Sequence, residues 1–170
     1  VMNNYNGRAG KIVSALQGIK DRAGTKVEVL HAVGGMLDSS GSPADIAAGI
    51  SKAIEMARVA DVAVVCVGTD ADVEHEGRDR KSLGLAGTQE EFVKAVVAAN
   101  PRTIVVQMSA GPLTVPWLSE HVPAMLQAWW GGEEGGHAIA DVIFGDVNPA
   151  GRLPHTVYAA ESQVPPLDEY

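Results

Sequence analysis

The chain contains the run Val62-Ala63-Val64-Val65-Cys66-Val67-Gly68, which is continuously apolar and rich in β-branched residues. Such a run is typical of a strand that is buried on both faces of a parallel sheet. Two later runs predict further strands, Thr103-Ile104-Val105-Val106-Gln107-Met108 and the shorter Ala124-Met125-Leu126-Gln127-Ala128-Trp129. We therefore expect a sheet that is centred on residues 62–68.

Amphipathic stretches alternate with these strands. Apolar residues recur at helical spacing in four segments, at 12–19, 46–57, 92–97 and 138–143. Ser42-Pro43 is a helix start, because serine caps a helix and proline suits its first position. Asn100-Pro101 closes the third segment, since the residue before a proline disfavours helical geometry. Helices alternating with β-branched strands indicate the α/β class.

The composition describes one globular domain. The chain has 170 residues, of which 46% are hydrophobic and 20% are charged, and its formal net charge is −8. This acidic balance disfavours nucleic acid and anionic membrane surfaces as partners, because both require clustered Lys and Arg. No stretch approaches the roughly 18 consecutive apolar residues of a membrane span. The amino terminus does not resemble a signal peptide, so we expect any export signal to lie outside this chain.

Several familiar sites fail on spacing. Gly10-Lys11-Ile12 lacks both the first glycine and the hydroxyl residue of a phosphate-binding loop. Asp70-Ala71-Asp72-Val73-Glu74-His75 begins like a calcium loop, but His75 replaces the turn glycine and Lys81 replaces the glutamate at the twelfth position. The nucleophile motif Gly-x-Ser-x-Gly is absent from the sequence. These failures disfavour phosphate-loop, calcium and serine-hydrolase chemistry.

Histidine and cysteine also give little indication of chemistry. Of the five histidines, only His75 has several carboxylates close in sequence, and surface or capping roles are the simpler interpretation for the others, which are His31, His121, His137 and His155. The single Cys66 excludes an internal disulfide and a cysteine-based zinc cluster. Inside an apolar strand we expect its thiol to behave as a small hydrophobic group. We expect neither a metal nor a cofactor.

One dense polar segment remains. Directly after the run 62–68, seven carboxylate or guanidinium groups fall within the eleven residues 70–80. Ligand sites in open parallel sheets form at the carboxyl ends of strands. About twenty residues separate Gly68 from the helix near Thr88, whereas most strand-to-helix loops take about two to six. The segment is either a functional loop or a solvated charged loop, and composition alone does not decide between them.

Two motifs resemble a known family. The first is Glu76-Gly77-Arg78-Asp79-Arg80-Lys81-Ser82-Leu83, continued by Leu85-Ala86-Gly87-Thr88-Gln89, and the second extends from Trp129-Trp130-Gly131-Gly132 to Asn148-Pro149-Ala150-Gly151-Arg152-Leu153-Pro154. Both are similar to signatures of the carboxyl-terminal α/β domain of family 3 glycoside hydrolases, and Asn4-Tyr5-Asn6-Gly7 resembles the start of that domain. The resemblance covers essentially the whole chain. It implies a three-layer α/β/α sandwich with a mostly parallel central sheet.

The resemblance also implies a chemistry. Retaining glycoside hydrolysis needs two carboxyl groups about 5 to 5.5 Å apart, a nucleophile and an acid/base. In this family the nucleophilic Asp belongs to a separate (β/α)8 barrel and the acid/base Glu to the present domain. By motif position the acid/base is Glu76, with Glu74 as the second candidate. Gly77 beside it would permit a backbone conformation unavailable to other residues. Loop-bracing ion pairs are the preferred interpretation of Arg78, Asp79 and Arg80, and Arg78 is the candidate for a substrate contact.

The family pattern predicts the domain organisation. We expect a domain over residues 1–160, a linker-like tail over 161–170, and a barrel outside this chain, because eight βα units need about 250 residues. The expected partners are a β-linked oligosaccharide or glycoside, of the β-glucoside or β-xyloside type, and the barrel domain, in cis or in trans. The parent enzyme is expected to be extracellular or periplasmic, and the isolated chain inactive. The alternatives are a non-catalytic sugar-binding or interaction module and, on fold class alone, a nucleotide-binding module.

Overall fold

A computed structural model describes residues 9–34 and 42–165 of the chain. The motif residues 4–7 and the last residues of the tail, 166–170, lie outside this description. Along the chain the elements are α1 (Ala15–Ala23), α2 (Pro43–Val59), β1 (Ala63–Gly68), α3 (Gln89–Ala99), β2 (Thr103–Met108), α4 (Pro116–His121), β3 (Ala124–Gln127), α5 (Gly135–Ile143) and the 3₁₀ turn η1 (Glu161–Gln163).

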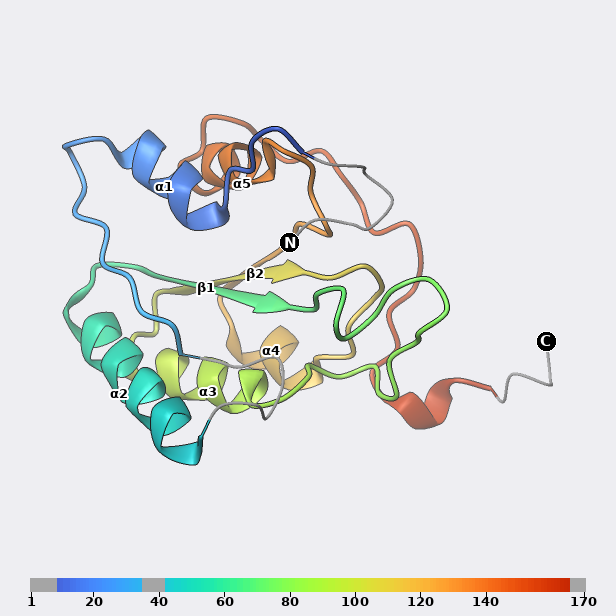
Figure 1. Ribbon diagram of the computed structural model, residues 1–170. Helices are drawn as coiled ribbons and strands as arrows, with labels where there is room; N and C mark the ends of the chain where they lie inside the picture. Colours follow the sequence, from blue (N-terminus) through green and yellow to red (C-terminus); the bar gives the residue numbers. More distant parts are fainter. Residues whose placement is uncertain (1–8, 35–41, 166–170) are drawn as a thin grey trace.

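The three strands form one parallel sheet in the order β1-β2-β3. Val65 of β1 lies opposite Val105 of β2, and Val106 lies opposite Leu126 of β3. Helices α1 and α5 lie on one side of this sheet, and α2, α3 and α4 lie on the other (Figure 1). The predicted three-layer α/β/α sandwich is therefore confirmed, and the loops that follow the strands meet at one edge of the sheet.

The core lies between the sheet and α2, α3 and α4. Val65 and Val105 face this side, where Val93 of α3 and Leu118 of α4 are fully buried. Each such side chain contributes about 1.5 to 3 kcal/mol when it is removed from water. Leu118 belongs to a helix of only six residues, which the apolar periodicity does not predict. Proline at the first position of that helix supplies the start that the short pattern lacks.

Polar side chains mark the start of α2 and the end of α3 at the residues that the sequence predicts. Ser42 caps α2, and its hydroxyl accepts a hydrogen bond from the amide of Asp45 at 3.1 Å. Asn100 ends α3 and is buried, and its side-chain amide donates to the carbonyls of Ala57 and Ala60, both at 2.9 Å. Asn100 thus joins the end of α3 to the end of α2 in addition to terminating its own helix.

Helices α1 and α5 cross at two glycines. An added Cβ at Gly18 would lie 2.1 Å from the carbonyl oxygen of Gly136, and one at Gly136 would lie 2.1 Å from that of Ser14. The amide of Gly136 also donates to the carbonyl of Val13 at 3.1 Å. The two helices therefore touch backbone to backbone, which larger residues at these positions would prevent.

Some predicted boundaries differ from the structure. The third strand ends at Gln127, two residues before the predicted limit, because Trp129 has a φ of +55° and cannot continue an extended chain. Within residues 9–34 and 42–165, no helix is both long and apolar enough to cross a membrane.

Candidate functional site

The charged segment 70–80 lies in the loop between β1 and α3, which we call loop 69–88. One side chain holds both ends of this loop together. The amide oxygen of Gln89 accepts from the backbone N–H of Gly68 at 2.8 Å, and its NH2 group donates to the carbonyl of Gly68 at 2.9 Å. Gln89 is buried, so water competes little for these bonds. The loop is thus pinned at the carboxyl edge of the sheet.

The strand itself ends at a glycine for a steric reason. Gly68 has a φ of +150°, and a Cβ there would lie 1.8 Å from the carbonyl oxygen of Met108. The close approach places the end of β1 against the end of β2. As a result, the loops after both strands begin side by side.

A two-residue hairpin carries Glu76. The backbones of His75 and Arg78 exchange hydrogen bonds of 3.1 and 2.9 Å, which leaves Glu76 and Gly77 at the tip. Gly77 has a φ of +78°, the value that a type II turn requires at its third residue. Glu76 is exposed, and its carboxylate has no hydrogen bond or ion pair to any residue within 9–34 or 42–165. The turn therefore presents a solvated carboxylate at the end of a hydrogen-bonded stem.

Glu74, only two residues earlier, is in the opposite environment. Its side chain is buried, and its Oε1 accepts from the Thr69 hydroxyl and from the backbone N–H of Ala110, the latter at 3.0 Å. Its Oε2 pairs with the Nε of Arg80 at 2.7 Å. Both carboxylate oxygens are occupied, so Glu74 connects the loop after β1 to the loop after β2.

Arg80 completes this brace. Its Nη2 donates to the carbonyl of Pro112 at 2.7 Å, and its side chain is 8% exposed. Its Nη1 is buried without a hydrogen-bond partner in the described parts of the chain. The predicted loop-bracing ion pair thus forms at Arg80. Asp79 and Arg78 are exposed and form no ion pair with residues that the structure describes.

Arg78 faces solvent beside Glu76 on the same hairpin. Its backbone holds the turn, and its guanidinium group has no protein partner in the two described ranges. Glu76 and Arg78 are thus both exposed on the same hairpin, whereas Glu74 is buried. A substrate contact at Arg78 stays a prediction.

Two tryptophans after β3 complete the same edge. Trp130 donates from its indole Nε1 to the carbonyl of Thr69 at 3.1 Å, which ties the third strand's loop to the first strand's loop. Trp129 is half-buried and makes an edge-to-face contact with His155, with ring centroids 5.8 Å apart. A positive φ at a residue as large as tryptophan is rare and needs surrounding structure to hold it.

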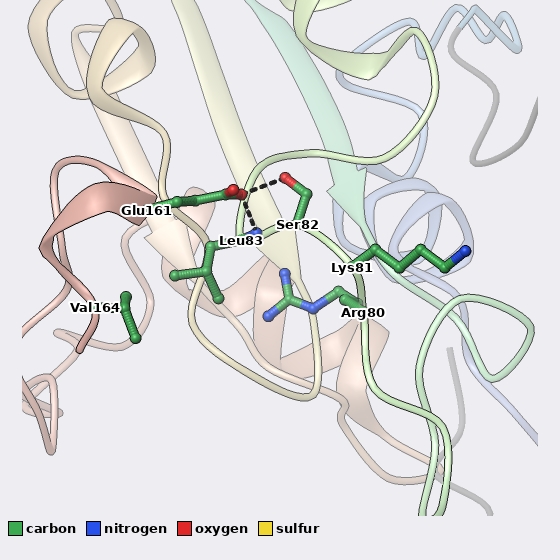
Figure 2. A pocket seen from close by; sticks show the side chains of 6 residues that line it. All are labelled: Arg80, Lys81, Ser82, Leu83, Glu161 and Val164. Carbon is green, nitrogen blue, oxygen red and sulfur yellow. Dashed lines mark hydrogen bonds between the residues drawn. The ribbon is translucent and has the colours of Figure 1, made fainter. Parts of the chain in front are cut away.

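Sequence reasoning misses one residue near the site. Glu161, at the start of the expected linker-like tail, accepts from the hydroxyl of Ser82 and from the backbone N–H of Leu83, the latter at 2.5 Å. Figure 2 shows both bonds beside a shallow hollow of about 150 Å³, lined by Arg80, Lys81, Ser82, Leu83, Glu161 and Val164. The contact joins residues 79 positions apart, and no local pattern indicates it.

The histidines take structural positions. His137 bridges Glu134 and Asp21, and these carboxylates raise its pKa above the ordinary value. His121 stacks on Trp117. In the segments that the structure describes, no group of three or more His, Cys, Asp or Glu side chains is arranged to hold a metal ion. Cys66 is exposed on β1, but protein atoms around its sulfur desolvate the thiol and raise its pKa.

Comparison with known proteins assigns the chain to a family. The family described as the glycosyl hydrolase family 3 C-terminal domain matches residues 1–170. The chain belongs to this family. A β-glucosidase of Rhizobium radiobacter is 48% identical over 109 residues, which are 64% of this chain and 13% of that protein. A β-xylosidase of Formosa agariphila is 36% identical over 165 residues, or 97% of this chain and 22% of that protein.

Solved structures agree with this assignment. A β-glucosidase structure from Erythrobacter marinus matches with a TM-score of 0.87 at 33% identity, covering 96% of this chain and 25% of that one. The family 3 domain described here therefore spans a quarter or less of the length of these relatives. The resemblance that the motifs indicate is confirmed.

Proposed function

We propose that this family 3 domain supplies the general acid/base of a retaining β-glycosidase, and that Glu76 is that residue. The single observation that carries the proposal is the contrast within loop 69–88. Glu76 is exposed at the tip of a hydrogen-bonded hairpin, whereas both oxygens of Glu74 are engaged in a buried brace. An acid/base must reach the leaving-group oxygen of a substrate, and only an accessible carboxyl group can do so.

The proposed mechanism has two steps, and in each step Glu76 exchanges a proton with the oxygen atom that leaves or attacks the anomeric carbon. A nucleophilic Asp on a separate barrel attacks the anomeric carbon while protonated Glu76 donates its proton to the departing glycosidic oxygen. Glu76, then ionised, accepts a proton from the water that cleaves the glycosyl-enzyme intermediate. The retaining mechanism requires the two carboxyl groups to lie about 5 to 5.5 Å apart when the domains assemble.

The brace under the hairpin supports this role. Glu74, Arg80 and their backbone partners at Ala110 and Pro112 fix the base of the stem. A fixed stem keeps the orientation of the acid relative to the leaving group, and misplacement of about 1 Å can reduce a rate about 100-fold. Arg78, which is beside the tip and free of protein partners in the described structure, is proposed to contact the substrate.

The proposed substrates are β-glucosides or β-xylosides. The support is that the Rhizobium radiobacter and Formosa agariphila relatives are named a β-glucosidase and a β-xylosidase, respectively. The sugar-binding surface of the barrel would select between them.

The test uses Glu76→Gln in the assembled enzyme and compares two substrates that differ in leaving group, an activated aryl glycoside and an alkyl glycoside. A good leaving group such as 2,4-dinitrophenolate departs without protonation, so we expect its release step to persist. An alkyl glycoside should lose about 100- to 10,000-fold in kcat/KM, the usual contribution of a general acid. Azide, which needs no general base, should restore turnover of the activated substrate as a glycosyl azide product.

Asp72→Asn provides the matched control, because Asp72 is another exposed carboxylate of the same loop. It should leave both substrates unchanged. Full activity of Glu76→Gln on the alkyl glycoside would refute the assignment. Sugar binding without any turnover by the intact native enzyme would instead favour the non-catalytic module.

A further inference from the structure

We propose that Glu161 is a positioning residue for the acid/base hairpin, acting as a strap from the carboxyl-terminal segment onto loop 69–88. The proposal rests on the proposed function of Glu76. It assigns a role to a residue that lies outside both family motifs.

The first support is the set of bonds that Glu161 accepts. Its Oε1 takes hydrogen bonds from the hydroxyl of Ser82 and from the backbone N–H of Leu83. The same Ser82 hydroxyl accepts from the N–H of Gly84 at 3.1 Å. One carboxylate thus organises three consecutive residues of a loop that has no helix or strand of its own in this part.

The second support is that these residues are also held from the other side. The carbonyl of Leu83 accepts from the N–H of Thr114 at 2.8 Å, in the segment that follows β2. Arg80, two residues before Ser82, reaches the same segment at Pro112. The loop segment 80–83 is therefore held between the loop after β2 and Glu161, and the hairpin at 75–78 directly precedes this segment.

The third support is electrostatic. The hydrogen bonds from Ser82 and Leu83, with a smaller contribution from the charge of Arg80, lower the pKa of Glu161 below its ordinary value. The carboxylate thus stays ionised through the neutral and mildly acidic range. Hydrogen bonds to an ionised acceptor are about twice as strong as neutral ones.

The fourth support is that Glu161 is presented by an ordered turn. Glu161–Gln163 forms a 3₁₀ turn, and the side-chain oxygen of Gln163 accepts from the N–H groups of Ala159 and Ala160, both at 2.9 Å. A hollow of about 150 Å³ lies beside this turn and is lined by Leu83, Glu161 and Val164 among others, and Figure 2 shows these side chains next to one another. Both hydrogen bonds between this turn and Ser82-Leu83 end on Glu161, so a single substitution removes both of them.

The experiment compares Glu161→Ala, Glu161→Gln and the control Glu120→Ala in the assembled enzyme. Glu120 is exposed on α4 and has no partner in the part of the chain that the structure describes. Glu161→Ala should lower kcat/KM for an alkyl β-glycoside about ten- to a hundredfold. The same substitution should change kcat/KM for the 2,4-dinitrophenyl glycoside less than about twofold, because the leaving group of this substrate departs without a general acid. Glu161→Gln should recover part of the loss, since its amide oxygen can accept the same bonds.

A second measurement is independent of the chemistry. Hydrogen exchange of the peptides covering 75–85 should become faster in Glu161→Ala and stay unchanged in Glu120→Ala. Equal losses for both substrates would show a merely structural role and overturn the proposal, as would unchanged exchange. If Glu76→Gln lacks the leaving-group dependence while Glu161→Ala still accelerates exchange at 75–85, the assignment of Glu76 fails and the strap itself stands.

Discussion

Glu74 and Glu76 differ in environment because the chain turns directly after Glu74. Residue Glu74 lies at the buried base of the stem, where Thr69, Ala110 and Arg80 occupy its oxygens. Gly77 then reverses the chain with a positive φ, so that Glu76 projects into solvent. Two identical side chains two residues apart therefore occupy different environments, one buried and paired and the other exposed.

We expect Glu74→Leu to lower the free energy of unfolding by about 3 to 5 kcal/mol, because it leaves the buried Arg80 guanidinium without its counter-charge. The double variant Glu74→Leu/Arg80→Met should lose much less than the sum of its two single variants, since no buried charge remains. Urea denaturation of the four proteins measures this coupling. Strictly additive losses would contradict the pairing.

The sequence motif indicates Glu76, but residue spacing alone does not exclude Glu74. The distinction depends on the amide of Ala110 and the carbonyl of Pro112, which belong to a different loop. Backbone partners carry no sequence signature. The turn at Gly77 was predictable, because glycine adopts the required φ at low cost.

At the scale of elements, the contact between α1 and α5 depends on small residues. Gly18 and Gly136 allow the two backbones to approach, and the ion pair between Arg22 and Asp146 joins the far end of the same contact. This pair lowers the pKa of Asp146. The outer layer is thus assembled from the two ends of the domain.

Gly136→Ala should separate the two helices and lower the free energy of unfolding by about 1 to 3 kcal/mol, the usual cost of overpacking. Gly135→Ala is the matched control, because it occupies the adjacent position of α5 and its added Cβ would meet no atom within 4 Å. The control should be neutral or stabilising by up to about 1 kcal/mol, as alanine favours helix. Thermal or urea unfolding distinguishes them, and equal effects would argue against the close crossing.

The bridge at His137 predicts a pH-dependent helix pair. Asp21 and Glu134 raise the pKa of His137, and His137 lowers the pKa of Asp21. The histidine contribution is complete below its ordinary pKa of about 6.5 and is lost as the pH rises through the raised value. The Asp21 contribution is present above its ordinary pKa of about 3.9 and is lost as the pH falls.

The stability difference between the native protein and His137→Gln should therefore be larger at pH 5.5 than at pH 8.5. Urea unfolding at the two pH values measures it. A difference that does not change between them would show that the bridge contributes no charge interaction.

The elements themselves were largely predictable. Strands β1 and β2 and helices α2 and α3 match their patterns, because each presents several apolar residues at one period. Helix α4 and the turn η1 were not predicted, since six and three residues are too few to establish a period. The early end of β3 depends on Trp129, whose backbone conformation is set by tertiary contacts.

For the whole molecule, the loops at the carboxyl edge form one connected unit. Trp130 links the loop after β3 to Thr69, Glu74 links the loop after β1 to Ala110, and Glu161 links the tail to Ser82. The fold class can be predicted because apolar runs typical of strands alternate along the chain with segments of helical spacing. These links join segments up to 79 positions apart, which no local pattern indicates.

The chain as printed, expressed alone, should hydrolyse neither aryl β-glucosides nor aryl β-xylosides above background, because our proposal places the nucleophile on another domain. Release of 4-nitrophenolate from both substrates measures this. Clear turnover that persists in Glu76→Gln but disappears on heating would show a complete and different active site in this domain.

The contact between α1 and α5 also governs when the domain can fold during its synthesis. His137 meets Asp21 across 116 positions of sequence, so α1 leaves the ribosome long before its partner exists. At about 5 to 20 residues per second, this interval lasts roughly 6 to 23 seconds. During that time α5 is not yet present to cover Gly18 and Ala23 of α1, so the outer layer on this side of the sheet can form only late in synthesis.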